Sequence, residues 1–213
     1  MLETATRHGV PTRCVWLDTP LAQAQVNLIE RLLDRHGSLP TPDELRQLAR
    51  REPGVLPPTS QMRALRELEP PSSDEGFAAV ERVPFERRPH PSETRPGVFV
   101  AAAALKAPGW QSTVENADPR APRLVFDWRP DGTQNDLADS VTLLAGTASG
   151  PVDGAVCVHP GGPPSCWCRP PLPGLPLAFA RRHSVDPARS ILVGTGPAHR
   201  TLARTLGAHY VAV

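Results

Sequence analysis

Three cysteines and one histidine lie close together near the C-terminal end of the sequence and could bind a metal ion. They follow a C-x-H and a C-x-C pattern, and they are Cys157, His159, Cys166 and Cys168. Thiolate sulfur and imidazole nitrogen are preferred ligands of zinc, and four of them form a closed tetrahedron with no position left for substrate. We therefore predict a structural zinc site in loop 157–168. The alternative is a turn that holds ordinary reduced cysteines.

Two arginines, Arg63 and Arg66, could bind a phosphate group. They lie three residues apart in the segment 61–68, which has a helical pattern, so both side chains fall on one face of the expected helix. Two guanidinium groups on one face can donate hydrogen bonds to phosphate oxygens. The alternative is a solvated face on which these arginines pair with Glu67 and Glu69.

The composition excludes a complete nucleotide-binding P-loop in this sequence. A Walker A loop requires a lysine within G-x-x-x-x-G-K-[ST]. Lys106 is the one lysine among 23 lysines and arginines in a chain of 213 residues, and no such glycines surround it. The 27 prolines further predict irregular segments between the regular elements.

Charge and hydropathy limit the expected partners and location. The formal net charge of +1 is too small for long-range electrostatic attraction of nucleic acid. A local cluster of arginines could still bind nucleic acid. The sequence contains no run of about 18 apolar residues, and its N-terminus has no signal-peptide pattern. We expect a cytoplasmic protein without a membrane partner.

The elements that must position these residues fall into two groups separated by the polar, proline-rich segment 87–96. Before it, Thr41 and Glu44 form a capping box, and Thr19 and Gly37 are expected at the two ends of the preceding helix. The expected strands and helices of this first group are 13–17, 20–36, 41–52, 61–68 and 76–85. We predict an N-terminal region over 1–86 and a linker over 87–96.

Beyond the linker, short apolar runs alternate with helical patterns. The expected strands are 98–105, 123–126, 155–157, 191–193 and 209–213. The expected helices are 134–146, 175–183 and 198–206. Strands that alternate with helices are typical of a parallel sheet, so we predict an α/β domain over 97–213.

Residues 12–85 resemble the C-terminal part of the kinase domain of polynucleotide kinase-phosphatases. The similarity lies in R-C-V-W-L-D-T-P at 13–20, P-P-S-S-D-E-G-F at 70–77 and V-P-F at 83–85. The resemblance implies an incomplete, P-loop-kinase-like piece that supplies the lid side of the domain, with arginines near phosphate groups. Its open strand edge would be covered by an upstream P-loop kinase portion or by a second copy of the chain.

Residues 97–213 resemble the zinc-containing branch of the haloacid dehalogenase-like phosphatases, which includes histidinol-phosphate and heptose-bisphosphate phosphatases. The similarity lies in C-V-H-P at 157–160, C-W-C-R at 166–169, P-L-P-G at 171–174, V-D-P-A-R-S at 185–190 and V-G at 193–194. The resemblance implies a Rossmann-like parallel sheet with a zinc loop.

The catalytic motifs of that family are missing at the matching positions. Ala101 and Ala103 stand where the family has Asp-x-Asp, and the remaining motifs read F-D-W-R at 126–129, R-P-P-L-P-G at 169–174 and G-T-G-P-A-H at 194–199. His199 falls where a magnesium ligand would lie, and the turn 194–197 could still bind phosphate through backbone N–H groups. We predict no catalytic residue and no magnesium.

The missing motifs favour a zinc-stabilised pseudo-phosphatase that serves as a binding or scaffold protein. Two alternatives stay open. The first is an active phosphomonoesterase of the histidinol-phosphate or heptose-bisphosphate type, with Asp127 and Asp131 as its carboxylates. The second is the C-terminal half of a longer ATP-dependent polynucleotide 5′-kinase.

Overall fold

The computed structural model describes residues 2–87 and 94–213, and a five-stranded parallel sheet lies at its centre. Its strands are β3 (Val98–Ala101), β4 (Arg123–Trp128), β5 (Val152–Cys157), β6 (Ile191–Gly194) and β7 (His209–Ala212). They pair in the order β5-β4-β3-β6-β7. The chain therefore places β4 and β5 on one side of β3, and then β6 and β7 on the other side. This is a Rossmann-type order. The predicted α/β class with a parallel sheet is confirmed.

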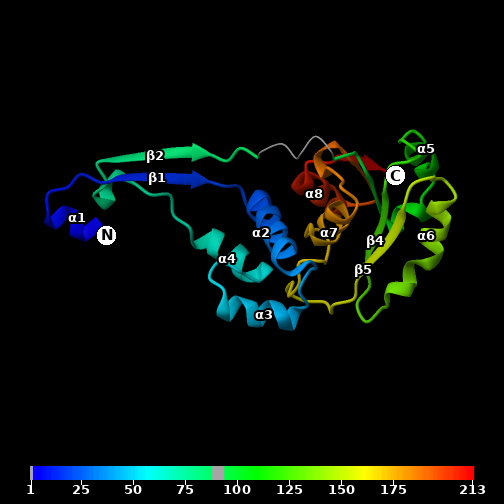
Figure 1. The fold of residues 1–213 in the computed structure, drawn as a ribbon, viewed down its shortest axis with the longest axis horizontal. Coiled ribbons are helices and arrows are strands. Elements are labelled where there is room, and N and C mark those ends of the chain that lie inside the picture. The colour runs from blue at the N-terminus through cyan, green and yellow to red at the C-terminus, as the bar shows by residue number, and fades with distance from the viewer. Residues whose placement is uncertain (1, 88–93) are drawn as a thin grey trace.

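Helices cover both faces of this sheet. In Figure 1 the sheet lies between α7 (Gly174–Arg182) and α8 (Pro197–Leu206) on one side and α5 (Trp110–Glu115) and α6 (Ala138–Ala145) on the other. The central strands are apolar and buried, as expected for parallel strands covered on both faces. Their carboxyl ends meet at one edge because Ala101 pairs with Phe126 and Val100 with Val193.

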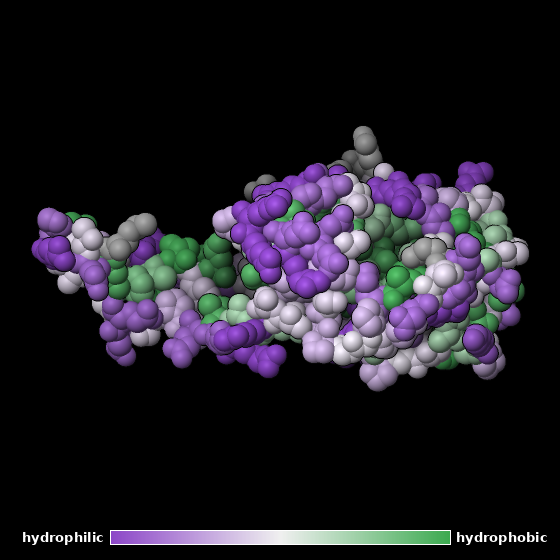
Figure 2. Space-filling model, turned by 90° about the horizontal axis from the view of Figure 1, so that it is seen from below, coloured by the Kyte–Doolittle hydropathy of each residue, from purple (hydrophilic) through white to green (hydrophobic). Residues whose placement is uncertain are grey.

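The N-terminal region contains a second, two-stranded parallel sheet. The elements in chain order are α1 (Leu2–Arg7), β1 (Arg13–Asp18), α2 (Leu21–His36), α3 (Pro42–Arg51), α4 (Pro58–Glu67) and β2 (Ala79–Pro84). Strands β1 and β2 pair with each other and extend as an arm beyond α2, α3 and α4, with α1 at the far end of the arm (Figure 1). Hydrophobic side chains gather along the face of this arm seen in Figure 2. We call the β1–β2 pair the ribbon.

Helix α2 shares a hydrophobic core with the five-stranded sheet. Its apolar face contacts α7 and α8, and Ile29 on that face is fully buried. An ion pair between Asp34 and Arg181 also joins α2 to α7. The core therefore runs across the expected boundary at 87–96, and the division into two regions there stays a prediction.

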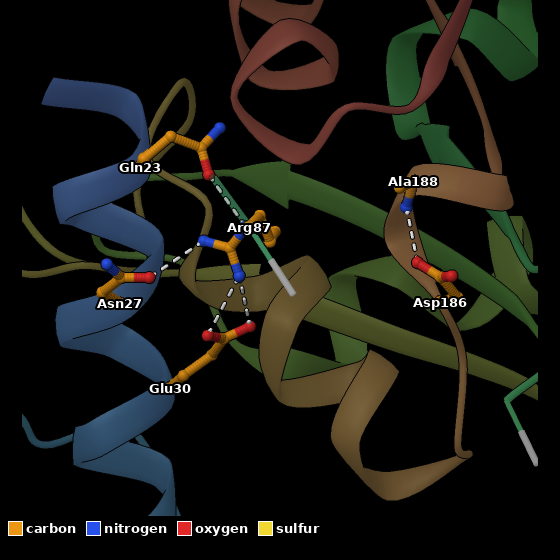
Figure 3. A network of polar contacts seen from close by, with 6 residues as sticks. All are labelled: Gln23, Asn27, Glu30, Arg87, Asp186 and Ala188. Carbon is orange, nitrogen blue, oxygen red and sulfur yellow. Dashed lines mark hydrogen bonds and ion pairs between the residues drawn. The ribbon is translucent and has the colours of Figure 1, made fainter. Parts of the chain in front are cut away.

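Both described ends of the expected linker are anchored, while residues 88–93 lie outside the described part of the chain. The Arg87 guanidinium donates hydrogen bonds to Gln23, Asn27 and Glu30, with nitrogen–oxygen distances of 2.8, 3.0 and 3.2 Å (Figure 3). These three side chains lie on one face of α2. On the other side of the gap, Arg95 forms a parallel bridge with Val185.

Several predicted element boundaries are corrected by the structure. The strand expected over 98–105 ends at Ala101, where its pairing with β4 ends, and a 3-10 helix follows over Ala102–Lys106. Helix α2 begins at Leu21 with Pro20 at its N-cap, so Thr19 does not cap it. The helix expected over 134–146 divides into a 3-10 helix, Gln134–Leu137, and α6. Helices α1 and α5 were not predicted.

Candidate functional site

The four predicted metal ligands lie around one point. Their donor atoms all fall within 4.8 Å of one another. The Cys157 Sγ atom lies 3.6 Å from Cys166 Sγ and 3.3 Å from Cys168 Sγ. The His159 Nδ1 atom lies 3.5 Å from Cys157 Sγ and 3.1 Å from Cys168 Sγ. The structure therefore brings together every residue of the predicted set.

This spacing fits tetrahedral coordination. With zinc–sulfur bonds of about 2.3 Å and zinc–nitrogen bonds of about 2.0–2.1 Å, the edges of the tetrahedron measure roughly 3.6–3.8 Å. The four separations given above, 3.1–3.6 Å, reach from the lower edge of this range to about 0.5 Å below it. They are well above the length of a disulfide bond, and all four cysteines of the chain are free. Three cysteines are buried and the histidine is half-buried, so the donor set could hold a metal ion away from water.

Two regular elements position the four ligands. Cys157 is the last residue of β5, and helix α7 begins at Gly174, shortly after Cys168. Between them, the Arg169 guanidinium donates hydrogen bonds to the carbonyl oxygens of Pro160 and Gly162, at 3.4 and 2.6 Å. These contacts close the glycine- and proline-rich loop over the cysteines.

A tryptophan on the neighbouring strand holds the backbone at His159. The Trp128 Nε1 atom donates a hydrogen bond to the His159 carbonyl oxygen at 2.9 Å, and the Arg169 guanidinium lies 4.9 Å from the centre of the Trp128 ring. The sequence analysis did not identify this role of Trp128. Its position immediately after the apolar part of β4 is the one signal that could have suggested it.

The three thiols lie close enough to compete for one negative charge. Hydrogen bonding to Cys157 and Cys168 lowers the pKa of Cys166 to about 2, and the hydrogen bond with Cys166 raises the pKa of Cys157 to about 11. Hydrogen bonding to Cys157 and Cys166 also raises the pKa of Cys168. Each thiol therefore influences the protonation of the other two. A divalent cation would stabilise all three as thiolates, because a coordinated thiol is deprotonated.

At the carboxyl edge of the sheet, the two positions matched to catalytic carboxylates carry methyl groups. Ala101 ends β3 and is buried, and Ala103 lies exposed in the 3-10 helix that follows. In open α/β sheets, ligands bind at the edge where the chain order reverses, which here lies between β3 and β6. The side chains of Ala101 and Ala103 offer neither a nucleophile nor a metal ligand there.

Asp127 is the carboxylate that β4 brings to this edge, and its two oxygens already have partners. One accepts a hydrogen bond from the Trp128 backbone N–H at 2.8 Å, and the other pairs with Arg129 at 2.9 Å. Asp131 lies in the following turn with a φ of 62°, and its backbone N–H bonds to the Val158 carbonyl oxygen. No hydrogen bond joins the side chains of Asp127 and Asp131 in the described residues.

His199 turns toward the sheet. Its Nδ1 atom accepts a hydrogen bond from the Thr195 backbone N–H at 3.2 Å, and its ring packs edge-on against Phe126. A Cβ atom on Gly194 would lie 2.5 Å from the Cβ atom of His199, so this packing depends on the glycine. The imidazole is therefore used for packing and for holding the turn before α8.

The predicted phosphate-binding arginines lie on the exposed face of α4. Arg63 pairs with Glu67 at 2.7 Å, and the Arg66 Nε atom bonds to the Met62 carbonyl oxygen at 3.4 Å. The pairing with Glu67 is the solvated arrangement that the sequence left as the alternative. Phosphate binding by Arg63 and Arg66 stays a prediction.

Comparisons with known proteins find similarity to solved structures alone. No protein-family profile and no curated protein matches the chain significantly. The chain is similar to a structure from Mesorhizobium loti described as a HAD-like phosphatase, with 18% identity and a TM-score of 0.42 over 58% of this chain and 74% of that one. It is also similar to a HAD-superfamily hydrolase, subfamily IA, from Geobacter sulfurreducens, with 11% identity and a TM-score of 0.35 over 95% of this chain and 86% of that one. Identities this low leave the activity open.

Proposed function

We propose that this chain is a zinc-stabilised, catalytically inactive relative of the haloacid dehalogenase-like phosphatases that acts as a binding or scaffold module. The observation that carries the proposal is the end of β3, where a buried Ala101 and an exposed Ala103 occupy the two positions that the resemblance matches to catalytic carboxylates. Without a carboxylate at these positions, the chain has no group there to attack phosphorus or to hold magnesium.

Zinc is the metal that this donor set favours. Three cysteine thiolates and one imidazole form a soft, tetrahedral set, whereas magnesium and calcium take oxygen ligands. Cys157, His159, Cys166 and Cys168 would hold the ion. A closed site of this kind stabilises the fold and leaves no coordination position for a substrate.

The first test is metal content. We expect about one zinc per chain, the occupancy of a single closed structural site. Cys166→Ser should lower both the zinc content and the melting temperature, because metal binding contributes to folding. Cys14→Ser is the matched control, since this half-buried cysteine lies on β1 outside the cluster. A metal-free protein after growth in zinc-replete medium, with equal melting temperatures for both variants, would contradict the zinc assignment.

The second test is phosphatase activity with magnesium. We expect no turnover of p-nitrophenyl phosphate or of sugar bisphosphates above background, because Ala101 and Ala103 supply no nucleophile. Turnover that survives repurification and is lost in Asp127→Asn would overturn the proposal. That result would instead support an active phosphomonoesterase that uses the carboxylate on β4.

We further propose that the ribbon belongs to the lid-side part of a polynucleotide-kinase-like domain. Neither outer edge of the ribbon pairs with another strand in the described residues. Val15 and Leu17 on β1 are 53% and 68% exposed, although parallel strands are normally buried on both faces. An isolated two-stranded sheet is marginally stable in water. These features support a larger parallel sheet whose other strands come from a P-loop portion.

The upstream coding DNA, read in frame before Met1, tests the kinase-like assignment. A G-x-x-x-x-G-K-[ST] pattern that follows an apolar run would supply the missing strand and phosphate loop. An in-frame stop codon directly upstream, together with no such pattern in the neighbouring coding sequences, would remove the kinase part of the proposal. The zinc and phosphatase assignments would be unaffected by that outcome.

A further inference from the structure

The buried cysteines are covered in part by a residue from the N-terminal region. Leu39 and Leu175 are the partly buried apolar side chains that pack against the cluster of Cys157, Cys166 and Cys168 in the described residues. Leu175 belongs to α7, directly after the metal loop, whereas Leu39 lies in the turn between α2 and α3. We propose that this turn forms an apolar wall of the metal centre, so that metal binding and docking of the turn stabilise each other. This inference rests on the proposed metal site.

Leu39 packs closely against the backbone at the start of α7. A Cβ atom added to Gly174 would lie 3.0 Å from the Leu39 Cδ1 atom and 2.4 Å from the Trp167 carbonyl oxygen. The leucine methyl group therefore packs against the backbone at the first residue of α7, where a glycine leaves the space for it. Pro40, the next residue of the turn, is buried.

The same turn is held to the α/β domain by α2. The apolar face of that helix is part of the main core, and Asp34 pairs with Arg181 of α7. Leu39 contacts both this core and the cysteine cluster. A cavity of about 510 Å³ lies beside it, lined by residues of the turn, β5 and α7. Shortening Leu39 would open the cysteines to water from that cavity.

Coupling of this kind acts in both directions. The metal holds loop 157–168 and the start of α7 in place, and these segments form the surface against which Leu39 packs. If docking of the turn increases metal affinity by some factor, metal binding favours docking by the same factor. The apolar shell around a metal site controls the access of water, and groups outside the ligand set commonly change metal affinity by about 10–100-fold.

The first experiment measures zinc release from the full-length protein to a chromogenic chelator. We expect Leu39→Ala to weaken zinc affinity by about tenfold and to speed release. Leu48→Ala is the matched control, because this leucine of α3 packs against the main core and not against the cysteines. Leu39→Met, which conserves apolar volume, should restore slow release. Equal release from Leu39→Ala and Leu48→Ala would overturn the proposal.

The second experiment measures amide exchange in residues 37–41 of the wild-type protein before and after zinc removal. We expect chelation to increase exchange in this turn, far from the ligands in sequence, and to have no further effect in Leu39→Ala. Unchanged exchange in the wild-type turn would contradict the coupling. Protein that contains no metal at the start would refute the proposed zinc site itself, and this outcome is identified by elemental analysis before either experiment.

Discussion

At the scale of single residues, His199 has a structural role at a position that the resemblance matches to a magnesium ligand. Its imidazole accepts the Thr195 N–H and packs on Phe126. Burial lowers the pKa of His199 below its usual range, and the charge of the nearby Asp127 carboxylate partly opposes this effect. The neutral imidazole is therefore the form that the fold favours.

This lowered pKa predicts a loss of stability on acidification. Below about pH 6.5 the unfolded chain binds a proton at His199 more readily than the folded chain does, so stability falls as the pH falls. The melting temperature of the wild type should therefore decrease more steeply than that of His199→Asn between about pH 7.5 and pH 5.5. The asparagine oxygen can still accept the Thr195 N–H. His209→Asn, at an exposed histidine of β7, controls for the loss of an imidazole.

At the scale of elements, a buried arginine joins the ends of two helices to the sheet. Arg123 is the first residue of β4 and is fully buried. It donates hydrogen bonds to the Thr147 carbonyl and hydroxyl oxygens, just after α6, and to the Val114 carbonyl oxygen in the last turn of α5. The partial negative charge at helix C-termini suits a cation in this position. Burial lowers the pKa of Arg123, and Asp118 opposes this effect.

Removal of this arginine should weaken the packing of both helices. Arg123→Met should destabilise the protein by about 1–3 kcal/mol, because carbonyl oxygens in a buried site lose their charged donor. Urea unfolding monitored by circular dichroism measures the change. Arg120→Met, the same substitution at an exposed position, should change stability by less than about 0.5 kcal/mol. If Arg123→Met were as stable as the wild type, the cost of burying the charge would equal the gain from its hydrogen bonds.

At the scale of the whole molecule, we expect the N-terminal helices and the α/β domain to unfold together if the core that they share determines the stability of both. Ile29 of α2 is fully buried and belongs to the same core as the strands β3 and β6. Two regions with separate cores would instead unfold in separate transitions. The position of the core therefore makes a testable distinction between one cooperative unit and two.

Ile29→Ala tests this distinction. We expect a loss of about 2–5 kcal/mol in the free energy of unfolding, since the substitution leaves a cavity in the core. Amide exchange in β3 and β6 should increase together with exchange in α2. Leu65→Ala, at a position of α4 that is 40% exposed, should have little effect. Unchanged exchange in β3 and β6 in Ile29→Ala would identify the N-terminal helices as a separate unit.

The sequence by itself determined the features that depend on nearby residues. The capping box of Thr41 and Glu44 forms as predicted, and Gly37 and Gly207 end their helices with left-handed backbones. The alternation of strands and helices indicated the parallel α/β class. The cysteine–histidine cluster was also predictable, because its four ligands fall within one loop and a short stretch of chain keeps them close together in space.

Only the tertiary structure decided the contacts between distant segments. Leu39 reaches the cysteine cluster, α2 joins the core of the α/β domain, and β3 ends at Ala101, where its pairing with β4 ends. Arg63 pairs with Glu67 on an exposed face, which its helical spacing allowed but did not require. The physical reason is that propensity and capping act within a few residues. Contacts between distant segments follow instead from which apolar faces meet when all the elements pack together.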